Sequence, residues 1–474
     1  MGAKIASQPA PAQGLGPGER TKVGKAARDL APHDSHAAFE RPAGAADPVT
    51  LLEQQGASRV PDLVPVRYGR MLSSPFSYYR GAALPMAADL ASTPVTGLTV
   101  QACGEAHLSN FGIFGSPERR LLFDLNDFDE TLPGPWEWDV KRLAASLEVA
   151  ARQNGFSRKQ RTAVVAAAAG SYREAMRRFA EMTHLEVWYA RADVEQLREE
   201  LESRLTRKQR KTWAAGEARA RSSDSMRSLR KLTEVDGTRH RIIADPPLIV
   251  PLRDLPGGQA EGIEDWIVSL IDKYRGSLDS TRRHLLEQYE YADLARKVVG
   301  VGSVGTRCWI VLMFGRDDSD PLFLQVKEAQ ASVLAPYAGG RRPTNQGQRV
   351  VEGQRLTQAA SDIFLGWVRV EAGVDGKRRD FYVRQLRDWK FSFAIETMVP
   401  EGMRLYGQQC GWTLARAHAR SGDRIAIGGY LGSSDAFDQA ITEFASSYAD
   451  QNERDYDALR EAAASGRIAV RSDV

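Results

Sequence analysis

The stretch KVVGVGSVGTRCWIVLMFGRDDSDPLFLQVKEA, residues 297–329, decides the fold. It begins with a G-x-G-x-x-G turn, a pattern that dinucleotide-binding proteins also contain. In those proteins the turn opens a helix, whereas here the β-branched and aromatic run TRCWIVLMF predicts a strand. A polar turn, GRDDSD, separates that strand from a second strand, LFLQVKEA, which carries Lys327. The stretch therefore predicts a glycine loop followed by a β-hairpin, within a β-rich region over residues 291–400.

The glycine loop and the lysine together favour a site for nucleotide phosphates. Backbone amides approach a phosphate closely where side chains are absent, and a nearby lysine balances the charge on the α and β phosphates. A strand, a glycine loop, a strand, a turn and a strand with a lysine form a layout similar to the N-lobe of a kinase. The candidate ATP-binding residues here are Gly300, Gly302, Ser303, Gly305 and Lys327.

A carboxylate from a following helix would hold this lysine in place. The run QGQRVVEGQRLTQAASDIF predicts such a helix, and Glu352 is its best candidate. Glu328 is a poorer one because it neighbours Lys327 on the opposite face of the strand. The alternative is that Lys327 and Glu352 are an ordinary exposed pair.

A second group of polar residues lies about two hundred positions earlier, in CGEAHLSNFG and LLFDLNDFDE. Phosphoryl transfer needs a group that orients or deprotonates the attacking hydroxyl, and groups that bind metal near the β and γ phosphates. By order and spacing, Glu105, Asn110 and Asp127 match these roles, with Asn110 and Asp127 as Mg²⁺ ligands. Asp124 sits earlier in the strand and is interpreted as structural. An EF-hand is disfavoured because Phe128 occupies a ligand position.

Composition excludes several classes of function. The 64 Lys and Arg residues against 61 Asp and Glu residues give a net charge of +3, so neither nucleic acid nor an anionic membrane is an expected partner. Three widely spaced cysteines favour a reducing compartment and are interpreted as structural. No apolar run is long enough for a membrane span or a secretory signal, so we expect a cytoplasmic protein.

The chain divides by composition into four parts. Residues 1–48 contain almost no large apolar residues and predict a disordered tail. Residues 49–290 contain the candidate catalytic loops and then, from about residue 157, a long run of charged helices. After the β-rich region, residues 401–474 predict further helices. His418, which ends one of them, is interpreted as structural, as is His107.

Four strings closely resemble a bacterial family called domain of unknown function 2252: SPFSYYRGAA, CGEAHLSNFG, LNDFDETLPGPWEWDVKRLAASL and YLGSSDAFDQAITEFA. The resemblance covers roughly residues 35–465. The segments of this family also look like those of the protein-kinase-like superfamily, especially aminoglycoside and choline phosphotransferases. In those enzymes Gly-Asp-x-His-x-x-Asn precedes Ile-Asp-Phe-Asp and then an Asp-Leu-Ala helix start, and GEAHLSN, NDFDE and WDVKRLA follow in the same order here.

The resemblance implies an α+β, two-lobed kinase-like fold that is circularly permuted and carries a helical insertion. The catalytic loops come first and the nucleotide clamp follows, and ARAHARSG would be the helix that leads into the catalytic loop of an unpermuted relative. Permutation is tolerated because a fold depends on its contacts and needs only exposed chain ends.

The implied activity is ATP-dependent, Mg²⁺-dependent transfer of phosphate to a small hydroxyl compound. The chain departs from the resembled pattern at Glu105, where relatives have aspartate, and at Cys103, where histidine is common. The extra methylene group of glutamate displaces the carboxylate, and a misplacement of about 1 Å can cost about a hundredfold in rate. Two alternatives stay open: a nucleotide-binding pseudokinase that serves as a switch or scaffold, and an AMP transferase. The sequence sets neither the acceptor nor the oligomeric state.

Overall fold

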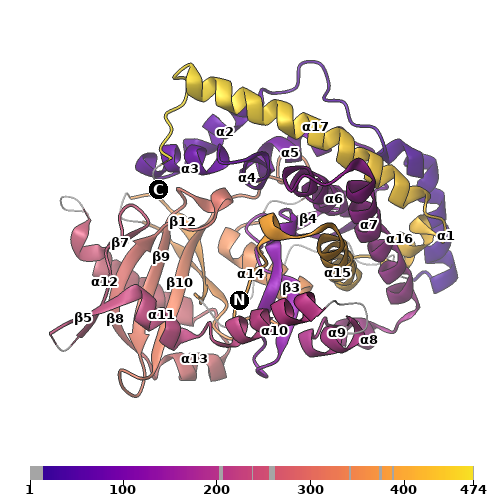
Figure 1. The fold of residues 1–474 in the computed structure, drawn as a ribbon. Coiled ribbons are helices and arrows are strands. Elements are labelled where there is room, and N and C mark those ends of the chain that lie inside the picture. The colour runs from indigo at the N-terminus through magenta and orange to yellow at the C-terminus, as the bar shows by residue number, and fades with distance from the viewer. Residues whose placement is uncertain are drawn as a thin grey trace.

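The computed structural model describes residues 14–201, 207–237, 239–255, 262–340, 343–372, 376–386 and 389–472. Helices and small antiparallel sheets make up this part of the chain, so the predicted α+β class is confirmed. Figure 1 shows a large sheet on one side of the molecule and a body of long helices on the other.

The large sheet has the strand order β11-β12-β10-β9-β8-β7, and each neighbouring pair is antiparallel. Its strands are β7 (Ile249–Pro251), β8 (Glu290–Lys297), β9 (Cys308–Phe314), β10 (Pro321–Ala329), β11 (Gly366–Val370) and β12 (Arg379–Gln385). Strands β9 and β10 are the predicted hairpin, and β8 leads into the glycine loop. The helix-opening alternative for G-x-G-x-x-G is therefore excluded.

Strand β10 is buried along its whole length because apolar clusters cover both faces of the sheet. One cluster joins Val311, Leu324 and Val326 to α12 (Ile263–Arg275). The other joins Ile310, Leu312 and Phe323 to α11 (Ser225–Leu232). Alternate strand residues thus pack against different helices, which fixes the register and the side to which Lys327 points.

The helical body is built from segments far apart in the sequence. It comprises α6 (Trp136–Gln153), α7 (Arg158–Glu181), α15 (Pro400–Ser421), α16 (Arg424–Leu431) and α17 (Ala436–Ala464). The ring of Trp136 stacks on Tyr172 with 5.7 Å between centroids. Helix α15 approaches α7 closely at Gly411, where an added Cβ would lie 2.2 Å from the Ala168 carbonyl oxygen. The last helices of the chain therefore share one core with α6 and α7.

Between α7 and the sheet the chain forms mainly short helices. They are α8 (His184–Tyr189), α9 (Val194–Leu201), α10 (Arg207–Arg221), α11, α12 and α13 (Ser280–Leu286), with a small hairpin of β5 (Thr233–Asp236) and β6 (Arg239–Ile242). Residues 202–206 of the predicted helical run lie outside the described residues.

Two small strand pairs carry the candidate catalytic loops. Strand β1 (Thr99–Ala102) pairs with β4 (Leu132–Pro135), and β2 (Phe111–Gly115) pairs with β3 (Leu121–Leu125). Both lie between the sheet and the helical body in Figure 1. The loops 103–110 and 126–131 connect these pairs. The preceding helices are α2 (Pro48–Gly56), α3 (Val64–Met71), α4 (Pro75–Gly81) and α5 (Ala83–Leu90).

The N-terminal segment differs from the expected disordered tail. Residues 17–30 form helix α1 (Pro17–Leu30), which packs against α16. Arg20 donates hydrogen bonds of 2.8 and 2.7 Å to the two carboxylate oxygens of Asp423. At Gly24 an added Cβ would lie 1.9 Å from the Ala426 carbonyl oxygen, so the two backbones touch. Composition misled because this helix is held by an ion pair and close backbone contact, with few large apolar side chains. Residues 1–13 lie outside the described residues.

Among the helices described, none combines the length and the apolar character that crossing a bilayer requires.

Candidate active site

A cavity of about 840 Å³ lies where the sheet and the two loops meet α2, α4 and α5. The loops contribute Glu105, Asn110 and Asp127 to its wall, and the β-rich region contributes Gly300, Gly302, Ser303 and Lys327. The two sequence segments that were predicted to share one site therefore line the same cavity. Gly305 and Glu352 do not line it.

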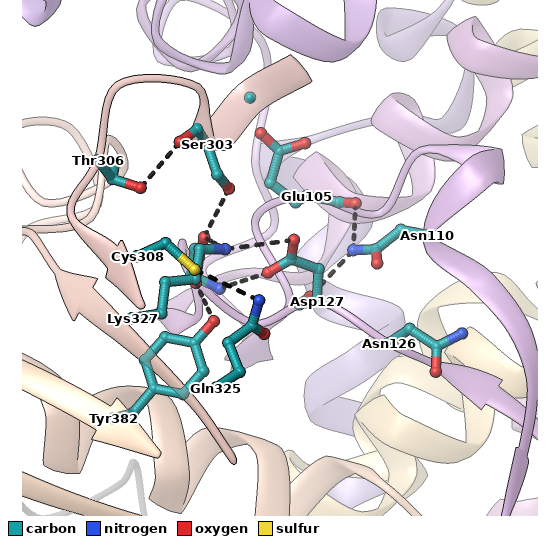
Figure 2. A network of polar contacts seen from close by, with 12 residues as sticks. Glu105, Asn110, Asn126, Asp127, Ser303, Thr306, Cys308, Gln325, Lys327 and Tyr382 are labelled. Atoms are coloured by element: carbon teal, nitrogen blue, oxygen red, sulfur yellow. Dashed lines mark hydrogen bonds and ion pairs between the residues drawn. The ribbon is translucent and has the colours of Figure 1, made fainter. Parts of the chain in front are cut away.

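Lys327 connects the two segments directly. It lies on β10, opposite Cys308 of β9 and Tyr382 of β12, and its side chain is buried. Its ammonium group donates a hydrogen bond to Asp129. It also lies 3.8 Å from the Asp127 carboxylate (Figure 2). Burial would lower the pKa of Lys327, but Asp127 and Asp129 hold that pKa well above its ordinary value. The lysine is therefore a fixed cation at the wall of the cavity.

Asp129 is a residue of this network that the sequence analysis did not single out. Besides Lys327, it accepts hydrogen bonds from the Ser303 hydroxyl at 3.1 Å and the Tyr382 hydroxyl at 2.7 Å. Burial would raise the pKa of Asp129, but Lys327 and Tyr382 hold it below its ordinary value. One carboxylate thus joins the glycine loop and two strands of the sheet. The sequence signal was its place two residues after Asp127, in Asp-Phe-Asp.

Glu352 does not hold Lys327, contrary to the prediction. It lies on α14 (Gln346–Thr357) and accepts a hydrogen bond of 2.7 Å from Gln348, one turn earlier. The residue of α14 that reaches the loop is Arg349, which donates to the carbonyl oxygens of Asp129 and Thr131 at 2.7 and 2.6 Å. The helix therefore braces the loop backbone, while the loop itself supplies the carboxylates for the lysine.

Glu328, the poorer candidate, is also engaged elsewhere. Its carboxylate lies 3.2 Å from both Arg307 and Arg379. This agrees with its place on the other face of the strand from Lys327.

Glu105 lines the cavity in a buried ion pair. Its carboxylate accepts a hydrogen bond of 2.5 Å from Arg142 of α6 and lies 3.5 Å from His107 Nε2. Burial raises the pKa of Glu105 to about 7, although the Arg142 charge opposes the shift. A carboxyl group with such a pKa can exchange a proton near neutral pH.

Asn110 connects the two candidate catalytic loops. Its amide nitrogen donates hydrogen bonds of 2.9 Å to the carbonyl oxygens of Glu105 and Asp127 (Figure 2). These bonds commit the NH₂ group to the backbone, so a metal would have to use the carbonyl oxygen of this side chain. The Asp127 carboxylate is the more open group, with 38% of its side chain exposed.

The cavity wall offers oxygen ligands of the kind that bind magnesium. Among the described residues, no cluster of three His, Cys, Asp or Glu side chains is arranged to hold a metal ion. Magnesium is commonly bound by one or two carboxylates together with substrate phosphates and water. Asp127, whose carboxylate is partly exposed at the cavity, fits that requirement.

The backbone of the catalytic loop is held by Asp139, at the start of α6. Its carboxylate accepts hydrogen bonds from the amides of Cys103 and Gly104 at 2.6 and 2.9 Å. His418 of α15 lies 3.2 Å from the same carboxylate, which agrees with its structural interpretation. Asp139 is the aspartate of the string WDVKRLA, so the sequence carried a signal for it.

The glycine loop is held from the opposite side by residues that the sequence analysis missed. Arg59 donates to the carbonyl oxygens of Gly302 and Val304, and the Val60 amide donates to that of Gly305 at 2.7 Å. Gly305 has φ +88°, a conformation that favours glycine. Its role is therefore in the shape of the loop. No local pattern at residues 59–60 points to this contact.

The three cysteines, Cys103, Cys308 and Cys410, are buried free thiols. Asp124 is fully buried and pairs with Arg416 at 2.7 Å. Both observations agree with the structural roles that the sequence suggested.

Comparison with known proteins gives one match. A family model described as an uncharacterized protein conserved in bacteria, domain of unknown function 2252, matches residues 59–462. No curated protein and no solved structure matches the chain.

Proposed function

We propose that this chain, which belongs to the domain-of-unknown-function 2252 family, is an ATP-dependent phosphotransferase acting on a small hydroxyl compound. The observation that carries the proposal is the meeting of Lys327 with Asp127 and Asp129 beside a glycine loop at one cavity. A cation, acidic groups and a glycine loop around one space are the parts that phosphoryl transfer requires.

Each group has a role in this proposal. Bound Mg-ATP supplies the phosphoryl group and the metal charge. The backbone of Gly300–Gly305 lies against the phosphates, and Lys327 balances their negative charge. Asp127 and the carbonyl oxygen of Asn110 hold the metal, while Asp129 keeps Lys327 and Ser303 in place.

Glu105 is the group that acts on the acceptor. It faces the cavity, and its pKa of about 7 allows it to accept the hydroxyl proton at neutral pH. Arg142 holds the carboxylate in one orientation, which lowers the entropy cost of placing it against a hydroxyl group.

The circularly permuted kinase-like fold belongs to the same proposal. Helix α15, which carries ARAHARSG, ends beside the strand that leads into the catalytic loop, where the Ser421 hydroxyl accepts a hydrogen bond of 3.2 Å from the Gln101 amide. A chain that joined α15 to β1 would run from helix to catalytic loop in the order of the kinase-like relatives.

Nucleotide binding tests the proposal first. Purified protein is heated with and without Mg-ATP, and the release of ADP is followed with a mixture of small alcohols. At a ligand concentration a hundredfold above Kd, we expect about 2.7 kcal/mol of stabilisation. A wild-type protein that responds to no nucleotide would contradict the proposal.

A pseudokinase is the second candidate, because the ion pair with Arg142 already engages the Glu105 carboxylate. It predicts nucleotide binding without turnover. If Glu105→Asp gains turnover that the wild type lacks, the second candidate is favoured. Protein made heavier by one AMP moiety in a lysate incubated with ATP would favour nucleotidyl transfer instead.

A further inference from the structure

Charged residues line the cavity in two groups. Lys327, Asp127 and Asp129 interact with one another in the group proposed for the nucleotide. In the other group, Arg80 interacts with the charges of Glu396 and Glu105, and Arg80 and Glu105 both line the wall. The backbone of Arg80 also borders the glycine loop, because an added Cβ at Gly302 would lie 3.3 Å from its carbonyl oxygen. The wall at Arg80 and Glu105 is the side where the acceptor would lie, because Glu105 is there.

Arg80, at the end of α4, makes no ion pair in the described part of the chain, although the charges of Glu396 and Glu105 act on it from beyond salt-bridge distance. No hydrogen bond or ion pair joins its guanidinium group to another residue in the described part of the chain, and its Nε is buried without a partner. Glu105 cannot serve as its full partner because that carboxylate is hydrogen-bonded to Arg142. A largely buried cation of this kind is stabilised by an anion that hydrogen-bonds to it.

A second arginine lies behind the same wall. Arg67 of α3 is 0% exposed, and its Nη2 donates to Gln55 Oε1 at 2.5 Å and to the Gly81 carbonyl oxygen at 3.0 Å. Gln55 and Gly81 both line the cavity. The Nε and Nη1 of Arg67 are buried and lack partners among the described residues. This wall thus carries two arginines that make no ion pair with a carboxylate among the described residues, in a region where charges are weakly screened.

The remaining groups on this side suit a small polar ligand. Burial, with the charges of Arg142 and Arg80, lowers the pKa of His107 well below its ordinary value, so its ring is neutral. Its Nδ1 is buried without a partner among the residues described. Ala83 and Leu84 add a short apolar surface beside Arg80. The wall therefore offers a cation, a neutral imidazole and room for a few carbon atoms.

We propose that the acceptor carries an anionic group, a carboxylate or a phosphate, which Arg80 binds while the acceptor hydroxyl faces Glu105. This inference rests on the phosphotransferase function proposed above. The acceptor is then a small hydroxy acid or a phosphorylated alcohol. Cationic alcohols such as choline and the aminoglycosides would place like charges together at this wall.

The reaction balances with these groups. The acceptor hydroxyl oxygen forms a bond to the γ phosphorus of ATP as the bond from that phosphorus to the bridging oxygen breaks. ADP leaves with the bond electrons, and the hydroxyl proton goes to Glu105. The product is a phosphate ester that keeps its original anionic group.

The test uses the full-length protein saturated with Mg²⁺ and a non-hydrolysable ATP analogue, which fills the triphosphate site. Four probes of similar size are then titrated while thermal unfolding is followed: D-glycerate, glycerol 3-phosphate, glycerol and choline. We expect a further rise in Tm with glycerate or glycerol 3-phosphate and none with glycerol or choline. Comparing glycerate with glycerol 3-phosphate shows whether the site prefers a carboxylate or a phosphate.

Arg80→Gln is the variant that locates the effect. It should weaken binding of the anionic probe roughly ten- to a hundredfold, the loss expected for one charge-assisted contact, and should leave the response to the ATP analogue unchanged. Arg460→Gln, at an exposed position on α17, is the matched control and should bind the probe like the wild type.

The outcomes separate the two proposals. A response to the ATP analogue without any response to the anions, or an anion response that survives Arg80→Gln, would overturn the inference and leave the phosphotransferase proposal standing. A rise with choline equal to that with the anions would overturn it as well. Failure of the ATP analogue to bind would overturn the phosphotransferase proposal and, with it, the role of the anion as acceptor. The wild-type comparison of probes needs no variant, so it decides the question even if Arg80→Gln does not fold.

Discussion

The Lys327 ammonium group donates a hydrogen bond to Asp129, a residue 198 positions earlier in the chain. This contact joins the sheet to the loop at residues 126–131 and buries a charged pair at the wall of the cavity. Both halves of the candidate site depend on it, so it yields the first prediction.

Replacing the lysine should destabilise the protein even without a nucleotide. Lys327→Met leaves Asp129 without its main cation, and we expect the free energy of unfolding to fall by about 3 kcal/mol in a denaturant titration. Asp129→Asn in the same chain should recover most of the loss. Lys159→Met, at an exposed position of α7, is the control and should change stability little. Losses that simply add in the double variant would show that the two side chains do not interact.

Asp127 should control the response to magnesium. Asp127→Asn removes the open carboxylate of the site, so the gain in nucleotide affinity on adding Mg²⁺ should shrink by about tenfold or more. Calorimetric titration with ATP in the presence and absence of Mg²⁺ measures this gain. Asp457→Asn, on the exposed face of α17, should behave like the wild type. An unchanged Mg²⁺ dependence in Asp127→Asn would remove Asp127 from the metal site.

Glu105 should make stability depend on pH. Its pKa is about 7 in the folded protein and 4.5 in the reference state, so the folded chain holds this proton more tightly. Relative to Glu105→Gln, the wild type should lose about 3 kcal/mol of stability as the pH rises from about 4.5 to 7, and little more above pH 8. Denaturant titrations of both proteins at several pH values measure the difference. Parallel curves would mean that Glu105 titrates normally.

The N-terminal helix should contribute to stability. Arg20→Met removes two charge-assisted hydrogen bonds to Asp423, and we expect a loss of about 2 kcal/mol in the free energy of unfolding. Lys22→Met lies on the same helix at an exposed position and should have little effect. Equal effects from the two substitutions would argue that α1 is not held by this ion pair.

Local patterns were enough to predict several parts of the molecule. The β-branched and aromatic runs on both sides of a polar turn gave β9 and β10, and the spacing of Glu105, Asn110 and Asp127 identified three residues that line one cavity. These features depend on neighbours within a few positions, which is the range over which sequence periodicity carries information.

Contacts between distant segments were not predictable in the same way. Whether Glu352 or Asp129 pairs with Lys327 depends on how α14 and the loop at residues 126–131 pack against the sheet. Helix α14 contacts that loop through Arg349, and the loop places Asp129 at the lysine. The ion pair of α1 likewise depends on Asp423, more than four hundred positions away. Neither contact produces a periodic pattern in the sequence.

The attachment of the glycine loop to Arg59 and Val60 has a consequence for how the cavity opens. Three carbonyl oxygens of the loop, those of Gly302, Val304 and Gly305, take their donors from these two residues. If the loop lifts to admit or release a ligand, it must either carry the start of the α2–α3 connection with it or leave three acceptors to be satisfied by water. Such a movement would therefore involve residues 59 and 60, which precede Glu105, Asn110 and Asp127 in the chain.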